Sequence, residues 1–188
     1  MSAAGDWSVG GITRRLFPIL VVLTTLELLG GLTLGSFEAT LRRYPSLLVL
    51  VPVTIGTAGN LGSILSARLS TAFHLGLLSF DPRDEELLGN TITTVLLAVT
   101  VFPVVGAGAW ALALATGGVR LSVGMVVVVA SLSGVVLAAL AIAVTVMAAY
   151  GAYRFGADPD DVVIPVVTNV CDVLGVLVLF GVVEVVVA

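Results

Sequence analysis

The residue with the clearest chemical role is an aspartate, Asp172, in an apolar stretch near the end of the chain. Asp172 is the only charged residue between Asp161 and Glu184. An aspartate at the centre of a bilayer costs about 2.5–3.5 kcal/mol even on the lenient insertion scale. Either a bound cation offsets that cost, or a protonated Asp172 hydrogen-bonds to another helix. We predict the first, which makes Asp172 a metal ligand.

Polar and backbone-loosening residues share a helical face with Asp172. Asn169 and Thr168 lie one turn before it, because residues three and four apart are neighbours on a helix. Pro165 lies a further turn back, and Gly175 lies close to one turn ahead. This stripe offers a carboxylate, an amide oxygen and a hydroxyl, the hard donors that suit Mg²⁺, Ca²⁺ or Mn²⁺. Since Mg²⁺ dehydrates reluctantly, we expect a largely hydrated ion, held through water by the carboxylate and amide oxygens.

A second polar segment interrupts the apolar run between Arg43 and Arg68, which contains no other charge. Glycine lets another backbone come close, and proline frees a carbonyl for a neighbour or an ion. Asn60 offers an amide oxygen at membrane depth, where polar side chains are costly, so we predict a functional role for it. A helix-packing seam is the alternative for Gly59 and Ser63. The residues that mark the segment are Pro52, Gly56, Gly59, Asn60, Gly62 and Ser63.

A further acidic residue, Glu27, falls near the middle of the first apolar run. An unpaired carboxylate is costly there, so Glu27 is a secondary ion ligand, a proton-coupling group or a hydrogen-bonded structural residue. The chain also has one cysteine, Cys171, and one histidine, His74. A lone cysteine excludes an intramolecular disulfide, and a lone histidine excludes a histidine-rich zinc site.

The composition shows what must position these residues. Of 188 residues, 59% are hydrophobic and 11% are charged, and the mean hydropathy is +1.19. Such values are typical of an integral membrane protein, and a net charge of −4 excludes a basic nucleic-acid-binding surface. We predict that residues 1–188 form a single all-α transmembrane domain of five helices. The predicted spans are residues 16–37, 44–67, 88–115, 122–150 and 162–185.

The connections between the spans carry most of the charge. Glu38, Arg42 and Arg43 are expected in or beside a short loop, and residues 69–78 in an interfacial or helix-extending segment. Five spans place the two termini on opposite sides of the membrane. One side then collects Arg14, Arg15, Arg68, Arg83 and Arg154, against Arg42, Arg43 and Arg120 on the other. By the positive-inside rule, we predict a multi-pass plasma-membrane protein with a cytoplasmic amino terminus.

Two motifs carry a family resemblance. The pattern Pro-x6-Gly-Asn-x-Gly-Ser at residues 52–63, followed by Arg68, resembles the signature of the MgtE/SLC41 divalent-cation transporter membrane domain. Residues 165–175 resemble the last span of that family. The similarity extends to Arg14-Arg15 and Phe37-Glu38 at the two edges of the first span. The chain departs from the family pattern at Ile64, where the family has a glutamine.

The resemblance implies a dimer whose pore is lined by the second and fifth spans. It also implies that Asp172 is the central ligand, with Asn60 beside it. We therefore predict transport of divalent cations, Mg²⁺ before Mn²⁺, Co²⁺ or Ca²⁺, by a homodimer or by a heterodimer with a paralogous half. The alternatives are a proton- or sodium-coupled carrier that uses Glu27 and Asp172, and a non-transporting membrane scaffold subunit. An enzyme is not expected, because the sequence has no catalytic triad pattern, phosphate-binding loop or multi-histidine metal motif.

Overall fold

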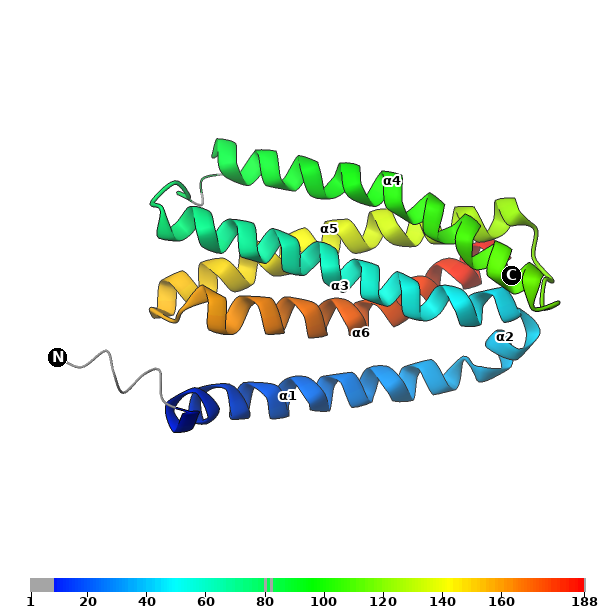
Figure 1. The fold of residues 1–188 in the computed structure, drawn as a ribbon, viewed down its shortest axis with the longest axis horizontal. Coiled ribbons are helices and arrows are strands. Elements are labelled where there is room, and N and C mark those ends of the chain that lie inside the picture. Colours follow the sequence, from blue (N-terminus) through cyan, green and yellow to red (C-terminus); the bar gives the residue numbers. More distant parts are fainter. Residues whose placement is uncertain (1–8, 80, 82, 188) are drawn as a thin grey trace.

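The structure is a bundle of long helices that lie side by side (Figure 1). It is a computed structural model that describes residues 9–79, 81 and 83–187. Residues 1–8, which the sequence places outside the first span, lie outside the described part. Within that part no strand is formed. The helices are α1 (Val9–Ser36), α2 (Glu38–Arg43), α3 (Pro45–His74), α4 (Glu85–Ala115), α5 (Val123–Phe155) and α6 (Pro159–Val187).

Five of these helices, α1, α3, α4, α5 and α6, are long and apolar enough to cross a membrane. The predicted fold class, all-α with five transmembrane helices, is confirmed. The helices have 28 to 33 residues, whereas about 20 are enough to cross a bilayer. Each extends beyond the predicted span at one or both ends. The segment after residue 67, for example, continues α3 as far as His74.

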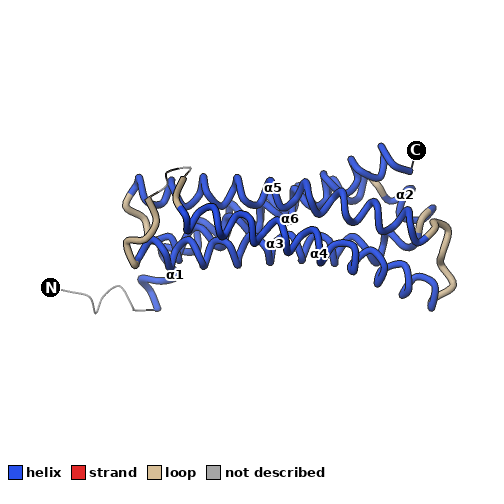
Figure 2. The backbone as a smooth tube through the Cα atoms, turned by 90° about the horizontal axis from the view of Figure 1, so that it is seen from above, coloured by secondary structure: helices blue, strands red, loops and turns tan. Residues whose placement is uncertain are grey.

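The five long helices do not contribute equally to the core. Helices α3, α5 and α6 pack against one another, and α4 covers α3 and α5. Among the described residues, α1 packs against α6 and touches the short α2, but has no comparable packing against α3, α4 or α5. Seen from above, the bundle is elongated, with the loops gathered at its two ends (Figure 2). Helix α1 begins at one end and α6 finishes at the other (Figure 1).

Small residues on α5 allow the central helices to come close. The sequence predicts a packing face on this segment, and Gly134, Ala138 and Ala141 are buried there. A Cβ atom on Gly134 would overlap the ring of Phe102, which is itself fully buried on α4. Such close backbone approach is how helices associate in lipid, where the hydrophobic effect between them is absent.

The connection between the first two spans is a short helix rather than the predicted loop. Helix α2 forms because Glu38 lies in its first turn and Arg42 and Arg43 in its last, which complements the helix dipole. Arg42 also donates a hydrogen bond to Glu38 one turn away. Beside it, the rings of Phe37 and Phe180 stack with centroids 4.0 Å apart, which fixes this corner against α6.

The start of α4 is set by an aspartate cap. Asp84 accepts a hydrogen bond from the backbone of Leu87 at 3.1 Å, and two more from the hydroxyl and backbone of Ser79, each at 2.7 Å. These bonds favour the ionised carboxylate, so they lower the pKa of Asp84 to about 2. The cap therefore remains charged at any physiological pH.

The glycine contact between α4 and α5 gives a stability prediction. Gly134→Ala should lower the free energy of unfolding in detergent by about 1–3 kcal/mol, because the new methyl group overpacks the Phe102 site. Gly151→Ala on the same helix is the matched control, since a Cβ there meets nothing within 4 Å. Thermal unfolding of both variants, followed by tryptophan fluorescence, checks this. Equal melting temperatures for the two variants would contradict it.

Candidate functional site

Asp172 faces a cavity of about 190 Å³ between α1, α3 and α6. It lies roughly halfway along α6, and its side chain is half-buried rather than turned fully towards lipid. Glu27 of α1 lines the same cavity, so the structure brings together two of the acidic residues that the sequence identified. The remaining lining residues are Gly30, Gly31, Leu34, Ile55, Val173 and Val176.

The position of the Asp172 side chain depends on a glycine of the facing helix. A Cβ atom on Gly59 of α3 would lie 2.9 Å from Oδ1 of Asp172 and 3.5 Å from Cγ2 of Thr168. The first distance is shorter than a Cβ atom normally allows. The carboxylate can therefore lie against the backbone of α3 only because residue 59 has no side chain.

A hydrogen bond between hydroxyls joins the same two helices one turn further along. Oγ of Ser63 lies 2.7 Å from Oγ1 of Thr168, and either hydroxyl can be the donor. Each hydroxyl also lies 2.9 Å from a carbonyl oxygen of its own helix, that of Gly59 for Ser63 and that of Ile164 for Thr168. Because a hydroxyl has one proton, one of the two donates across to the other helix while the other donates to its own carbonyl. This bond orients Thr168 towards α3, beside the carboxylate.

Two further glycines of the motifs also mark close contacts. A Cβ on Gly62 would lie 2.5 Å from Val167 and 3.3 Å from the buried thiol of Cys171. A Cβ on Gly175 would lie 3.0 Å from Ile55. Each of these glycines therefore makes room for a side chain of the facing helix, along the helix pair that carries the site.

The other residues that the sequence predicted for the site lie around it. Asn169 is half-buried and donates a hydrogen bond of 2.8 Å to the carbonyl of Pro165. Asn60 is exposed on α3 and lies outside the cavity lining. Gly56 faces open space. Within one chain, the cavity thus brings Glu27 to Asp172, whereas Asn60 points elsewhere.

The chemistry of the cavity favours a cation. Its described lining contains two carboxylates, no basic side chain and otherwise apolar or glycine residues. Two like charges in one apolar cavity are unfavourable unless a cation or a proton offsets them. Asp172 and Glu27 are therefore the residues that could hold a metal ion directly or through water.

Comparison with known proteins now bears on this arrangement. The profile of the MgtE family, described as divalent cation transporters, matches residues 51–182. That range covers most of α3 and all of α4 and α5, and it continues to the last turns of α6. The chain belongs to the MgtE family. Its relatives are transporters rather than enzymes, which agrees with the expectation that the chain has no catalytic centre.

Individual relatives of this MgtE-family chain are found among animal proteins. Solute carrier family 41 member 3 of Rattus norvegicus is 28% identical over 160 residues, which is 78% of this chain and 34% of the relative. The Mus musculus protein of the same name is 27% identical over 154 residues, 77% of this chain and 30% of the relative. The chain thus spans about a third of the length of these relatives. No solved structure matches it.

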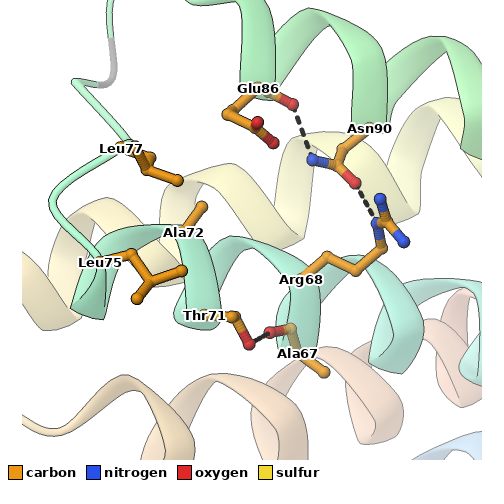
Figure 3. A pocket seen from close by; sticks show the side chains of 8 residues that line it. All are labelled: Ala67, Arg68, Thr71, Ala72, Leu75, Leu77, Glu86 and Asn90. Carbon is orange, nitrogen blue, oxygen red and sulfur yellow. Dashed lines mark hydrogen bonds between the residues drawn. The ribbon is translucent and has the colours of Figure 1, made fainter.

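A second hollow, which the sequence did not predict, lies near the end of α3 (Figure 3). Arg68 donates a hydrogen bond to the amide oxygen of Asn90 on α4, and Asn90 in turn donates to the carbonyl of Glu86 at 2.7 Å. Asn90 is buried. Its position in an apolar helix could have predicted this hydrogen-bonded contact from the sequence, because amides in a membrane-spanning helix need partners. The volume of this hollow is about 470 Å³.

The contact between Gly59 and Asp172 yields a functional prediction. Gly59→Ala should displace the Asp172 carboxylate and strongly reduce divalent-cation flux into proteoliposomes, since the methyl group would lie 2.9 Å from Oδ1. Gly108→Ala on α4, outside the cavity and both motifs, is the control, because its methyl group meets nothing within 4 Å. Flux is measured with an ion-sensitive dye inside the vesicles. Similar flux through both variants would exclude a positioning role for Gly59.

Proposed function

We propose that this MgtE-family chain transports divalent cations, with Mg²⁺ as the principal ion, through a pore in which Asp172 is the central ligand. The observation that carries the proposal is the position of Asp172 halfway along α6, facing a cavity that it shares with Glu27. A carboxylate at this depth needs a counter-charge, and a passing cation supplies one. Membership of a family of divalent cation transporters supports the same conclusion.

The ion remains largely hydrated in this proposal. The cavity holds about 190 Å³, and a water molecule takes up about 30 Å³, so several waters fit beside an ion. Mg²⁺ gives up its waters reluctantly and is commonly held by one or two carboxylates. Asp172 and Glu27 provide that number. The hydroxyl of Thr168 and the amide of Asn169 lie within a turn of Asp172 and can bind the outer waters.

A second copy of the chain, or a paralogous half, would complete the pore. Among the described long helices, α1 packs against α6 and covers one side of the cavity. In the single chain, only 11% of the most apolar 18-residue stretch of α1 is buried. Two copies related by a two-fold axis could place two Asp172 side chains on opposite sides of one path. In that arrangement α3 and α6, the second and fifth spans, line the pore, and the exposed Asn60 of α3 can reach it.

A coupled carrier is the second candidate, because two carboxylates in one cavity can share a proton or a sodium ion as well as a divalent cation. In a carrier of this kind, Glu27 and Asp172 would bind and release the coupling ion. This alternative requires a dependence of flux on a pH or sodium gradient, whereas a channel requires none.

The location proposed for the protein is the plasma membrane, crossed by the five long helices. The amino-terminal ends of α1 and α6 and the carboxy-terminal end of α3 share one end of the bundle (Figure 1). Arg14, Arg15, Arg68, Arg83 and Arg154 belong to that half of the bundle, whereas Arg42, Arg43 and Arg120 belong to the other. By the positive-inside rule, this excess of five arginines over three supports a cytoplasmic location for the first end.

Substitution of the central carboxylate tests the proposal. Asp172→Asn should reduce Mg²⁺ flux into proteoliposomes by about tenfold or more, because even weaker outer-shell changes at metal sites cost 10–100-fold. Glu184→Gln, on the same helix but outside the cavity, should transport like the unchanged protein. Dye-reported Mg²⁺ uptake is the measurement. Uptake by Asp172→Asn equal to that of the unchanged protein would exclude Asp172 as the central ligand, and no uptake by the unchanged protein would favour a scaffold subunit.

The role of the second carboxylate distinguishes a channel from a carrier. In a channel, Glu27→Gln should lower the Mg²⁺ affinity but leave uptake independent of a pH gradient. In a proton-coupled carrier, an imposed gradient should drive uptake by the unchanged protein, and Glu27→Gln should abolish that effect. Uptake measured with and without a gradient, in both proteins, separates the two.

A further inference from the structure

Three potential metal ligands from two helices meet at one end of the bundle, away from the Asp172 cavity. His74 is the last residue of α3, Asp158 immediately precedes α6, and Asp160 lies in the first turn of α6. One ligating atom from each side chain lies within 4.8 Å of the other two. All three side chains are exposed, so an ion could reach them from solution.

A buried serine on α3 anchors two of these ligands. Ser70 is only 3% exposed, and its hydroxyl donates a 2.6 Å hydrogen bond to Oδ1 of Asp160. The carbonyl of the same residue lies 2.9 Å from Nδ1 of His74. A histidine that ligates a metal usually donates its other ring N–H to a carbonyl or carboxylate, which fixes the tautomer and the ring orientation. Ser70 thus orients His74 and Asp160 in the way that outer residues orient ligands in metal sites.

These hydrogen bonds leave one ligating atom of each side chain for an ion. Because Nδ1 of His74 donates a hydrogen bond to the Ser70 carbonyl in this arrangement, Nε2 is the nitrogen that can bind a metal. Asp160 uses Oδ1 for Ser70, and Asp158 uses Oδ1 to accept the backbone N–H of Asp160 at 3.0 Å. The Oδ2 atom of each aspartate takes no part in these bonds. A helix-capping role is enough to explain the position of Asp158. It does not explain why His74 lies beside the two aspartates or why Ser70 donates a hydrogen bond to Asp160.

We propose that His74, Asp158 and Asp160 form a second divalent-metal site, which takes Zn²⁺ or a similar transition ion such as Co²⁺ or Ni²⁺. One imidazole and two carboxylates suit these ions, with water in the remaining position, whereas Mg²⁺ prefers oxygen donors alone. The site lies at the end of the bundle and not in the Asp172 cavity, since Asp158 and Asp172 are separated by roughly 20 Å along α6 at 1.5 Å per residue. A bound ion would clamp the end of α3 to the start of α6, the two helices that carry the Asp172 site.

The single histidine provides a direct test. Because His74 is the only histidine in the chain, the imidazole signals of protein labelled at histidine report on this site alone, once any affinity tag is removed. Zn²⁺ titrated into the full chain in lipid nanodiscs should shift these signals and saturate at one equivalent. Asp160→Asn and Asp158→Asn should weaken the binding about tenfold or more, and Ser70→Ala about tenfold through the lost orientation.

Two controls keep this test independent of the transport proposal. Asp172→Asn should leave the Zn²⁺ response of His74 unchanged even if it abolishes transport, and the exposed Asp81→Asn should also leave it unchanged. The proposal is overturned if millimolar Zn²⁺ does not shift the His74 signals. It is also overturned if both aspartate variants bind Zn²⁺ as tightly as the unchanged protein, or if Mg²⁺ shifts the signals at the same concentration as Zn²⁺.

Discussion

The close approach of α3 to α6 is the constraint on which the rest of the structure depends. In lipid the helices gain nothing from hiding apolar surface, so their contact relies on tight packing and a few hydrogen bonds. Gly59, Gly62 and Gly175 remove the side chains that would hold the two backbones apart. The hydroxyls of Ser63 and Thr168 then meet at 2.7 Å. The carboxylate of Asp172 lies against the backbone of α3 at Gly59 and lines the cavity that α1 helps to form.

Much of this arrangement could be predicted from the sequence, because a membrane restricts what an apolar run can do. Five long apolar runs give five helices, and a carboxylate isolated among apolar residues must lie near the middle of one. Helical periodicity says which residues share a face, but not which neighbour that face meets. The meeting of Glu27 with Asp172 and the exposure of Asn60 therefore came only from the structure. Helix α2 was missed because six residues give little periodic signal.

The two proposed metal sites differ in the chemistry that the chain offers. The middle of the bundle provides carboxylate, hydroxyl and amide oxygens, with space for water, which suits a hard ion that is bound weakly enough to leave. The end of the bundle adds an imidazole and residues that fix the ligands, which suits a softer ion that stays. In the two proposals, the separation of these donor sets allows one ion to pass through the chain while another is retained.

The sparse packing of α1 has a consequence for motion. Free energies of local opening follow the number of buried contacts, so segments with few of them unfold or detach more readily than the core. Helix α1 contributes Glu27 and one wall of the cavity, yet in the described part of the chain α6 is the one long helix against which it packs. The stacked rings of Phe37 and Phe180 tie down its carboxy-terminal end. Amide hydrogen exchange should therefore be fastest towards the start of α1, and a swing about that aromatic anchor would open the cavity sideways.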